Sequence, residues 1–511
     1  MHWVNWTIRR PLEFTAYKFI LTIFGVNIPV LYAINVFILF LSSFLLYWII
    51  QELLPDHRYL AFATGLIYLF YPADYTRMWL MMISHHLAWM LILISFVLLI
   101  DFARNGHIIS LLCALLLFTI TLGEYEGQLG VMVAFCFLLV AIYWRIPWKR
   151  RLALLSPLLV AGLFVIWRMI VQPALKVYDP YVSEFALSPE IFAQKIAMGF
   201  RVLLLSWTEP YLLFLNFPHK NIILFIIFGV AVILFGMAAY VVYRLIGIKN
   251  LDSLTSITGK YKKEEIKMDL YLLLAGCALL VAGYLPVITI YQPSLYEVST
   301  RVNFYAIPGA ALMAAALLNL GAVLLANYAE QLRAMVLAGA VPLLLVGMTT
   351  QMMVQNASRQ VWDGQKELWT QLFEIVPNAP DRTIVIFVLP GYKHLGFAQT
   401  PPFVASWEVN WGLQVLYNNP YLFGGYDYPD INVGGEVKML PEGVLIESLE
   451  TPIPYSKIIF VQYDPGIRRL KLMTRIEETL NLPFSVQGYN PIQNLLSAKA
   501  NTLQYRYMVG R

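Results

Sequence analysis

A series of long apolar runs constrains this sequence more than any other feature. A membrane-spanning helix needs roughly 20 predominantly apolar residues, because the hydrocarbon core is about 30 Å thick and a helix rises about 1.5 Å per residue. The sequence contains about ten runs near this length. They lie at 28–50, 59–72, 83–103, 107–122, 128–144, 151–171, 221–246, 269–290, 304–327 and 332–353. The pattern predicts a polytopic α-helical membrane domain over residues 1–353, in which the short runs 59–72 and 107–122 need their flanks to cross.

The composition agrees with a membrane protein. Of the 511 residues, 59% are hydrophobic and 13% are charged, whereas soluble domains carry about 25% charged residues. The net charge of +5 comes from basic residues gathered in a few loops, which is a signal of topology and does not indicate a nucleic-acid partner. The cysteines lie inside apolar runs without metal-ligand spacing, so we expect no disulfide framework. They are Cys113, Cys136 and Cys277.

Basic residues in the loops set the expected orientation. The loop "WRIPWKRR" and the segment from Arg244 to Lys267 are rich in lysine and arginine, and such loops stay in the cytoplasm. By alternation, the loops that hold Arg58, Arg104 and Arg333 fall on the same side, and the other connections lie outside a plasma membrane that we take to be bacterial. These are 1–27, 72–83, 122–128, 172–220, 291–303 and everything after 353. The apolar segment 196–215 is broken by charges and by Pro210, so we expect an interfacial or re-entrant element on the outer face.

After residue 353 the pattern changes to that of a small extracytoplasmic α/β domain, 354–511. "SRQVWDGQKELWTQLFEIV" has the period of an amphipathic helix, and "NAPDRTIVIFVLP", "GVLIESL" and "SKIIFVQYD" each contain a strand pattern. "IRRLKLMTRIEETL" is predicted to be a further amphipathic helix. Two long loops lie between these elements, "PGYKHLGFAQTPPFVASWEVNW" and "YLFGGYDYPDINVGGE". Long loops are often functional; these either pack irregularly on the membrane domain or form a lid.

Polar residues gather at the expected outer ends of the apolar runs, in four clusters. A carboxylate there is suited to take a proton from an attacking hydroxyl, and an arginine is suited to hold a lipid phosphate. The alternative for each residue alone is a solvated or snorkelling side chain at a loop end. The clusters are Asp74, Arg77, His85 and His86; Glu124, Tyr125 and Glu126; Glu297, Arg301, Asn303 and Tyr305; and Arg168, Lys195 and Arg201.

Several stretches, in order, resemble the GT-C superfamily of membrane glycosyltransferases, which includes protein O-mannosyltransferases, aminoarabinose transferases and oligosaccharyltransferases. They cover the membrane part, 8–330. A short helix that ends in Gly-x-Asn precedes a Leu-rich span, and a Pro precedes polar residues at the next outer turn. A Tyr-Glu closes the following hairpin, and an Arg-aromatic-Pro-Gly element comes later. The stretches are "RRPLEFTAYKFILTIFGVN", "LIYLFYPADYTRMWLMMISHH", "LGEYEGQLGVMV" and "TRVNFYAIPGAALMAAALL".

The resemblance implies an inverting transfer of a sugar from a polyprenyl-phosphate donor to a glycan, lipid or protein acceptor at the outer leaflet. Asp74 would act as base, or as ligand of a metal or the acceptor, and Glu126 would orient the acceptor or brace its hairpin. The donor phosphate would be held by Arg301, with Arg168 and Arg77. Residues facing the acceptor or forming the lid would be Tyr125, Glu297, Asn303, Tyr426 and Asp427. No cofactor is indicated beyond a divalent cation such as Mg²⁺ or Mn²⁺, which the sequence leaves open.

The sequence departs from the superfamily pattern at its start. The catalytic acid expected in a first outer loop has no match, because the resemblance begins at about Arg9 and the first acid is Glu13. Either a helix and an acidic loop are encoded upstream of Met1, or the chain lacks the usual base. Two further functions therefore stay open. One is a non-catalytic relative that binds lipid-linked glycan or serves as an envelope-assembly subunit. The other is a transporter, which the scarcity of polar residues in mid-membrane disfavours.

Overall fold

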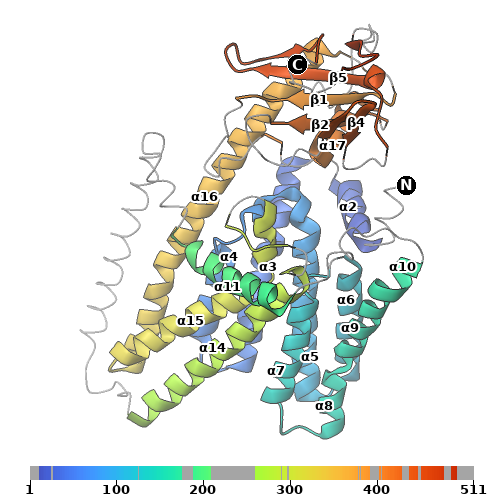
Figure 1. Ribbon diagram of the computed structural model, residues 1–511. Helices are drawn as coiled ribbons and strands as arrows, with labels where there is room; N and C mark the ends of the chain where they lie inside the picture. The colour runs from blue at the N-terminus through green and yellow to red at the C-terminus, as the bar shows by residue number, and fades with distance from the viewer. Residues whose placement is uncertain are drawn as a thin grey trace. The chain divides into compact units, whose positions relative to one another are not determined.

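The computed structural model describes residues 11–491 except 25–26, 125, 175–187, 209–258, 289–290, 296–297, 378, 380, 392–401, 404–405, 420, 429–436, 447–450 and 477–484. The protein is mostly helical, with a small group of strands near the C-terminus (Figure 1). The chain divides into two compact units, unit 1 (residues 1–352) and unit 2 (residues 353–511). Each unit is described by itself.

Unit 1 contains the apolar helices. In chain order its first half consists of α2 (Pro11–Phe24), α3 (Ile28–Leu53), α4 (Arg58–Phe70), the 3₁₀ turns η1 (Tyr75–Met78) and η2 (Leu80–Met82), α5 (Ile83–Asn105), α6 (Ile108–Glu124) and α7 (Leu129–Ile142). There follow α8 (Trp148–Leu154), α9 (Ser156–Ile166), the π-turn η3 (Trp167–Val171), α10 (Gln172–Ala174) and α11 (Pro189–Leu205). The last elements are α14 (Gly259–Ile288), the 3₁₀ turn η7 (Val298–Asn303), α15 (Ile307–Leu325) and α16 (Ala329–Ile375), which continues into unit 2.

Local sequence signals fix several helix ends. Asn27 caps α3, because its Oδ1 accepts a hydrogen bond from the Val30 N–H at 3.4 Å, and a proline stands in the first turn, where its missing N–H costs nothing. Ser188 caps α11 in the same way, accepting from Ile191 N–H at 3.3 Å. α5 ends at Gly106, whose φ of 76° is left-handed, the conformation that glycine adopts readily at helix ends.

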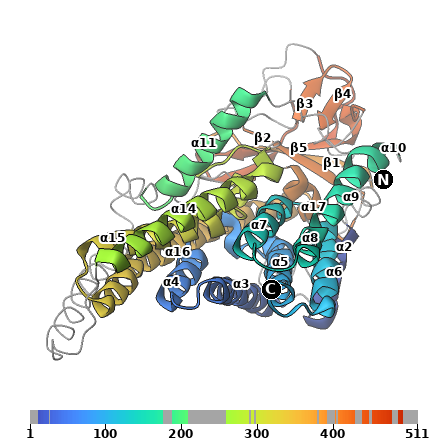
Figure 2. The same cartoon turned by 90° about the horizontal axis from the view of Figure 1, so that it is seen from below.

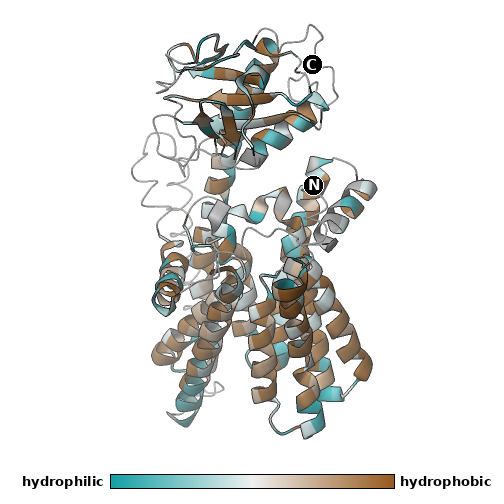
Figure 3. Cartoon of the chain, turned by 45° about the vertical axis from the view of Figure 1, so that its right-hand side comes forward, coloured by the Kyte–Doolittle hydropathy of each residue, from teal (hydrophilic) through white to brown (hydrophobic). Residues whose placement is uncertain are grey.

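Six of the described helices are long and apolar enough to cross a membrane: 29–53, 83–105, 148–171, 259–288, 307–325 and 329–375. Three shorter apolar helices cover 58–70, 108–124 and 129–142. The prediction that these runs are helical is confirmed, while the expected run 221–246 lies outside the described residues. Brown, hydrophobic ribbon covers most of these helices in Figure 3. Such helices are compatible with a membrane protein.

Small residues let the helices of unit 1 approach closely. α14 and α15 lie side by side (Figure 2) and form the most extensive helix contact of the unit. A Cβ on Gly283 of α14 would meet the backbone of Tyr305, and one on Gly309 of α15 would meet the backbone of Leu280. Glycines at such crossings allow backbones to pack without a side chain between them. The two helices therefore hold η7, the turn between them, against the core of the unit.

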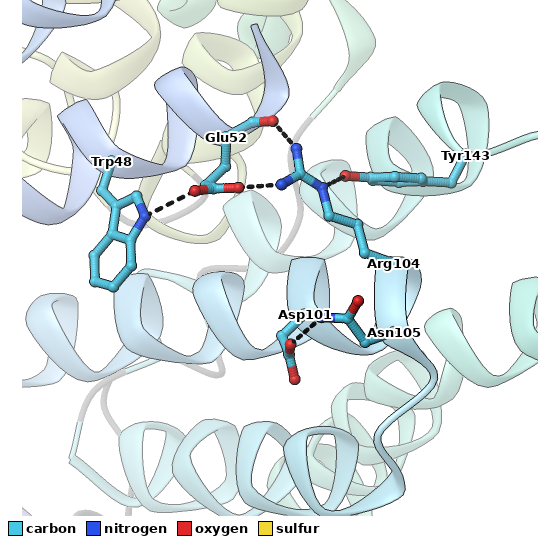
Figure 4. A network of polar contacts seen from close by, with 6 residues as sticks. All are labelled: Trp48, Glu52, Asp101, Arg104, Asn105 and Tyr143. Carbon is cyan, nitrogen blue, oxygen red and sulfur yellow. Dashed lines mark hydrogen bonds and ion pairs between the residues drawn. The ribbon is translucent and has the colours of Figure 1, made fainter. Parts of the chain in front are cut away.

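One end of the bundle is closed by a polar network (Figure 4). Arg104, in the last turn of α5, donates to the carboxylate and the backbone carbonyl of Glu52 in α3. Its Nε donates to the hydroxyl of Tyr143, after α7, at 2.9 Å. The indole N–H of Trp48 donates to the other carboxylate oxygen of Glu52 at 3.1 Å. One guanidinium thus joins the last turns of α3 and α5 to the residue that follows α7.

The segment 196–215, expected to be interfacial or re-entrant, falls partly on the helix α11. Gly199 of α11 lies against the ring of Tyr284 in α14, and the carbonyl of Leu203 accepts from the Tyr71 hydroxyl at 3.0 Å. Lys195 donates to the carbonyl of Ile288, the last residue of α14, at 2.8 Å, a favourable place for a cation. These contacts fix α11 on the described part of unit 1, and residues 209–215 lie outside it.

Unit 2 is an α/β domain around a four-stranded sheet. The strands are β1 (Ile384–Val388), β2 (Phe423–Asp427), β5 (Ile458–Asp464) and β6 (Arg469–Leu472), in the order β2-β1-β5-β6. β1 runs parallel to β2 and β5, whereas β6 is antiparallel to β5. The helix α17 (Ser406–Tyr417) connects β1 to β2, and β3 (Val437–Leu440) with β4 (Gly443–Ile446) forms a separate hairpin.

Both faces of the central sheet are covered, which explains why β1 is buried along its whole length. One face packs on the last turns of α16, through Leu368, Trp369, Leu372 and Phe373, and on α17. The opposite face packs on the β3–β4 hairpin and on Tyr455 and Met473. The amphipathic helix predicted at 358–376 is thus confirmed, and it is continuous with the apolar helix before it.

The prediction of a helix over 467–480 is wrong in its first part. Residues 469–472 form β6, with Leu470 buried and Arg469 and Lys471 exposed, which is the period of two of a strand. The preceding turn explains the change of direction. The Asp464 carboxylate accepts from the backbone N–H groups of Gly466 and Ile467, as aspartate does in tight turns.

The two long loops predicted in this unit are shorter than expected. Part of the first, from Ser406, is the amphipathic helix α17. Part of the second is β2, which pairs with β1 from Phe423 to Asp427. This strand contains two glycines, which are rare in strands, so its composition did not indicate a strand. Glycine is required at position 424, because a Cβ there would meet the side chains of Val409 and Leu413 in α17.

Candidate functional site

Asp74 lies in the turn between α4 and α5, where it caps η1. Its Oδ1 accepts hydrogen bonds from the Thr76 backbone N–H at 2.9 Å and from the Thr76 hydroxyl at 2.7 Å. Asp74 is fully buried. Burial raises the pKa of its carboxyl group, opposed by the charge of Arg77, the bonds from Thr76 and the charge of Arg301. Its Oδ2 has no hydrogen-bond partner among the described residues. One oxygen therefore holds the turn, and the other is left for a ligand.

Arg77 is the most deeply placed cation of this turn. It is 1% exposed, and its Nη1 donates to the carbonyls of Tyr68 and Leu69, at 2.9 and 2.6 Å. Its guanidinium carbon lies 5.3 Å from the centre of the Tyr68 ring. The last carbonyls of a helix lack partners within the helix, so Arg77 completes the end of α4. The structure places this expected phosphate ligand inside the fold.

Residues of η7 join this turn from the other half of unit 1. The backbone N–H of Tyr75 donates to Thr300 Oγ1 at 3.2 Å. The side-chain amide of Asn303 donates to the carbonyls of Ala73 and Ser294, at 2.8 and 2.9 Å. The hydroxyl of Tyr284 donates to Asn303 Oδ1 at 2.9 Å. Asn303, expected to face an acceptor, thus has its amide occupied in bracing the two turns together.

Arg301 lies beside these braces and is half-buried. Its guanidinium carbon is 5.3 Å from the centre of the Tyr291 ring, and its Nη2 is 3.5 Å from the Tyr291 hydroxyl. Its Nε has no hydrogen-bond partner in the described part of the chain. Its positive charge lowers the pKa of Asp74. The structure therefore brings together Asp74 and Arg301, which the sequence had placed in separate clusters.

His86, which the sequence placed in the same cluster as Asp74, belongs to this group in the structure through a partner on another helix. Its Nδ1 is 2.6 Å from Oδ1 of Asn35 in α3, and the Asn35 amide donates to the carbonyl of Arg77 at 3.0 Å. Because Asn35 Oδ1 can only accept, Nδ1 of His86 carries the proton. The available signal was a single asparagine within an apolar run, since buried polar residues in such runs are expensive.

Polar atoms without partners concentrate in this part of unit 1. Most buried polar atoms in proteins are hydrogen-bonded, so a group of exceptions indicates bound water, an ion or a ligand. Among the described residues the exceptions here are Asp74 Oδ2, Arg77 Nε and Nη2, His86 Nε2, Arg301 Nε, Thr350 Oγ1 and Gln351 Oε1. Gln351 of α16 is attached to the group, because its amide donates to the carbonyl of Asp74 at 3.3 Å.

Glu126 and Arg168 form a second polar group. Arg168 Nη2 lies 3.6 Å from Glu126 Oε1, and its Nη1 donates to the side-chain oxygen of Gln172 at 3.0 Å. The pair ties the turn between α6 and α7 to η3. The amide of Gln128 donates to the carbonyl of Thr121 at 2.8 Å and closes that turn. This ion pair holds the turn that contains Glu126, and a role for Glu126 toward an acceptor stays a prediction.

Four of the expected site residues remain: Tyr125, Glu297, Tyr426 and Asp427. Tyr125 and Glu297 lie outside the described residues. Tyr426 and Asp427 belong to β2 in unit 2: Tyr426 is buried in the sheet core, and burial raises the pKa of Asp427. Among the residues that the structure describes, no three histidines, cysteines or carboxylates lie close enough together to hold a metal ion.

The chain was compared with known protein families, curated proteins and solved structures. No protein family, no curated protein and no solved structure matches the chain.

Proposed function

We propose that this protein is a membrane glycosyltransferase of the GT-C type, which transfers a sugar, with inversion, from a polyprenyl-phosphate donor to a glycan, lipid or protein acceptor. The resemblance of the ordered sequence stretches supports this function. The buried polar group around Asp74 and Arg301 supports the location of the site. In this proposal the chain crosses the membrane about ten times, and both the site and unit 2 lie at the outer face.

The observation that carries the proposal is the combination of Asp74 and Arg301. Asp74 has a carboxylate oxygen without a partner among the described residues, and Arg301 is half-buried close enough to act on its charge. A phosphate diester on a lipid needs a cation to hold it, and a guanidinium is suited to that geometry. An attacking hydroxyl needs a base within hydrogen-bond reach. In this scheme Arg301 holds the donor phosphate and Asp74 accepts the proton.

The buried Arg77 takes a positioning role in this scheme. Its side chain donates to a carbonyl at the end of α4, and its backbone carbonyl accepts a hydrogen bond from Asn35. It therefore sets where the Asp74 turn lies and adds positive charge behind it. The Glu126–Arg168 pair holds the neighbouring hairpin.

A second candidate is a non-catalytic protein that binds lipid-linked glycan. The observation in its favour is that Asp74 is fully buried and already caps η1, so its carboxylate has a structural reason to be present. Under this alternative, Arg301 still holds a lipid phosphate, but no proton is taken from an acceptor.

The variant Asp74→Asn separates the two candidates, because asparagine caps helical turns as well as aspartate does but cannot act as a base. The full chain is reconstituted in liposomes with a panel of polyprenyl-phosphate sugars. Donor binding and the release of polyprenyl phosphate are measured by mass spectrometry, with added Mg²⁺, with added Mn²⁺ and with chelator. An enzyme predicts that Asp74→Asn keeps donor binding and folding but loses at least about a hundredfold in transfer rate.

Two further variants complete this test. Arg301→Gln is expected to weaken donor binding, whereas Arg58→Gln, at an exposed arginine at the start of α4, is expected to change neither binding nor transfer. Donor binding by the wild-type chain without transfer of any sugar in the panel would favour the non-catalytic candidate. Full transfer by both Asp74→Asn and Arg301→Gln would exclude the proposed site.

A further inference from the structure

The connection between α7 and α9 is strongly basic. Between Gln128 and Tyr178 the sequence contains no aspartate or glutamate, while Arg145, Lys149, Arg150 and Arg151 lie within seven consecutive residues. Of the described helices that pack on α8, α5 carries the acid Asp101. That carboxylate is occupied by Asn105, His107 and Ser110. Within the part of the chain that the structure describes, the connection therefore has more positive charge than the helices packed on α8 neutralise.

One of the four basic residues has a structural role. Arg150 is half-buried, and its Nη1 lies 3.3 Å from the carbonyl of Ala103 and 3.2 Å from that of Arg104. These carbonyls belong to the last turn of α5, where a cation is favourable. Arg150 is thus used within the fold. Arg145 and Lys149 are exposed, whereas Arg151 is half-buried, and its buried Nε has no hydrogen-bond partner in the described part of the chain.

Those three residues are arranged with two exposed tryptophans. The guanidinium carbon of Arg151 lies 4.5 Å from the centre of the Trp144 ring. Trp144 is 64% exposed and Trp148 is 60% exposed, and Arg145 and Lys149 are exposed as well. An exposed indole beside basic side chains is typical of the level of lipid headgroups. Stacking on the indole also holds the Arg151 guanidinium in one place.

An apolar stripe runs from this basic corner along α8 and α9. Only 17% of the most apolar 18-residue window of this helical segment, 148–171, is buried within the protein. Its exposed side chains recur at helical spacing, and they are Leu152, Leu159, Leu163 and Ile166. A cationic, aromatic end that continues into an apolar stripe matches a molecule with an anionic head and a hydrocarbon chain.

We propose that this corner binds an anionic membrane phospholipid, with Arg145, Lys149 and Arg151 on its phosphate and the acyl chain along the stripe of α9. The corner is separate from the candidate site at Asp74. α5 has 23 residues and therefore spans about 34 Å. The Asp74 turn precedes its first residue, whereas Arg150 contacts its last turn. The proposed lipid site therefore lies at the end of α5 opposite the Asp74 turn, and the inference does not depend on the proposed function.

Native mass spectrometry of the full chain in detergent tests this site. Phosphatidylglycerol and phosphatidylcholine with the same acyl chains are titrated separately, and bound lipids are counted. The variant R145Q/K149Q/R151Q is compared with K438Q/K457Q/R468Q, which removes three exposed basic residues from unit 2. A basic side chain near an anionic headgroup contributes about a fivefold factor in affinity. We expect the first variant to bind phosphatidylglycerol about a hundredfold more weakly and the second to bind it as wild type does.

Two variants keep the total charge and guard against misfolding. R145K/K149R/R151K is expected to bind phosphatidylglycerol to within about threefold of wild type, because it preserves the charge. Trp144→Ala removes the ring under Arg151 and is expected to weaken binding about fivefold. Equal binding of both lipids by the wild-type chain would overturn the proposal. So would wild-type affinity for phosphatidylglycerol in both R145Q/K149Q/R151Q and Trp144→Ala.

Discussion

At the scale of single residues, buried arginines and amides hold the ends of helices in unit 1. The last carbonyls of α4 have no partner within the helix, and Arg77 supplies one from the following turn. Asn35 and Asn303 do the same for loop carbonyls, each from a distant part of the chain. These side chains convert a loop between two apolar helices into a fixed platform for Asp74.

Arg77→Ala is expected to lower the free energy of unfolding by about 3 kcal/mol, because it removes two charge-assisted hydrogen bonds and leaves the partly buried Leu69 carbonyl without its Arg77 donor. Unfolding of the full chain in mixed micelles of increasing denaturing detergent provides the measurement. Arg58→Ala is the control, since Arg58 is exposed at the other end of the same helix. Its expected change is within about 0.5 kcal/mol. Equal effects of the two variants would contradict the structural role given to Arg77.

A similar prediction concerns Arg104, which lies at the end of α5 opposite the Asp74 turn. Arg104 reaches three acceptors on two neighbouring segments, and lysine cannot reproduce that planar geometry. Because the side chain is about one-third exposed, solvent screens part of the interaction. We expect Arg104→Lys to cost about 1 kcal/mol of unfolding free energy, measured in the same micelles.

A double-mutant cycle tests how much of this lost unfolding free energy comes from the Arg104–Tyr143 hydrogen bond. Tyr143→Phe removes the hydroxyl that accepts from Arg104 Nε. The effects of Arg104→Lys and Tyr143→Phe are expected to be less than additive, because residues in contact share one interaction. Strict additivity would show that the two side chains do not interact in solution.

At the scale of elements, close helix crossings in unit 1 depend on glycines. Gly347 of α16 faces the end of α4, where a Cβ would fall on the backbone carbonyl of Phe70. A backbone atom cannot move aside as a flexible side chain can, so a methyl group there must separate the two helices. This crossing also bears on the candidate site, because Gln351 lies one turn further along α16 and bonds to Asp74.

Gly347→Ala is therefore expected to destabilise unit 1 by about 2 kcal/mol, the usual cost of overpacking. Gly321→Ala is the matched control, because nothing lies within 4 Å of the Cβ that it would add to α15. That variant should be neutral or stabilising by up to about 1 kcal/mol, since alanine favours a helix. Thermal unfolding in one detergent compares the two. A neutral Gly347→Ala would show that α16 does not pack this closely on α4.

At the scale of the whole molecule, the two units have separate cores. Unit 1 contains one large apolar cluster, and unit 2 contains a cluster on each face of its sheet. The helix α16 contributes to both units, because its last turns cover one face of the sheet. Trp369 lies there with its ring centre 5.3 Å from that of Phe387.

This division predicts which fragments of unit 2 can fold. A fragment of residues 353–511 keeps the last turns of α16 and is expected to be soluble and monodisperse. A fragment of residues 377–511 lacks them and should aggregate. The difference is the burial of four side chains of α16 at about 2 kcal/mol each, about 8 kcal/mol in total, which is comparable to the stability of a whole domain. The four are Leu368, Trp369, Leu372 and Phe373.

Size-exclusion chromatography and hydrogen exchange of the β1 and β5 amides measure this outcome. Protected strand amides in 353–511 and none in 377–511 are expected. Equal protection in both fragments would show that the sheet does not need α16.

The elements with a strong local signal could be predicted from sequence alone. Apolar runs such as 28–50 and 83–103 are helical in the structure, and β1 and β5 lie where short apolar runs indicated strands. β6 and α17 could not be placed, because a strand pattern of four residues resembles part of an amphipathic helix and because α17 lies within a glycine- and aromatic-rich stretch. Pairing with β5 and packing on the sheet decide these two elements.

For the candidate site, the sequence by itself determined which chemical groups are present: a carboxylate at Asp74, a guanidinium at Arg301, and polar residues near the ends of apolar runs. Only the tertiary structure decided which of them meet. The Tyr75–Thr300 bond joins positions 225 residues apart, a distance over which no local pattern carries information. The tertiary structure also gives the two arginines different surroundings. Arg77 is buried and bonds to carbonyls at the end of α4, whereas Arg301 is half-buried. Burial and pairing depend on every helix that packs around a residue, and a single sequence without that packing cannot specify them.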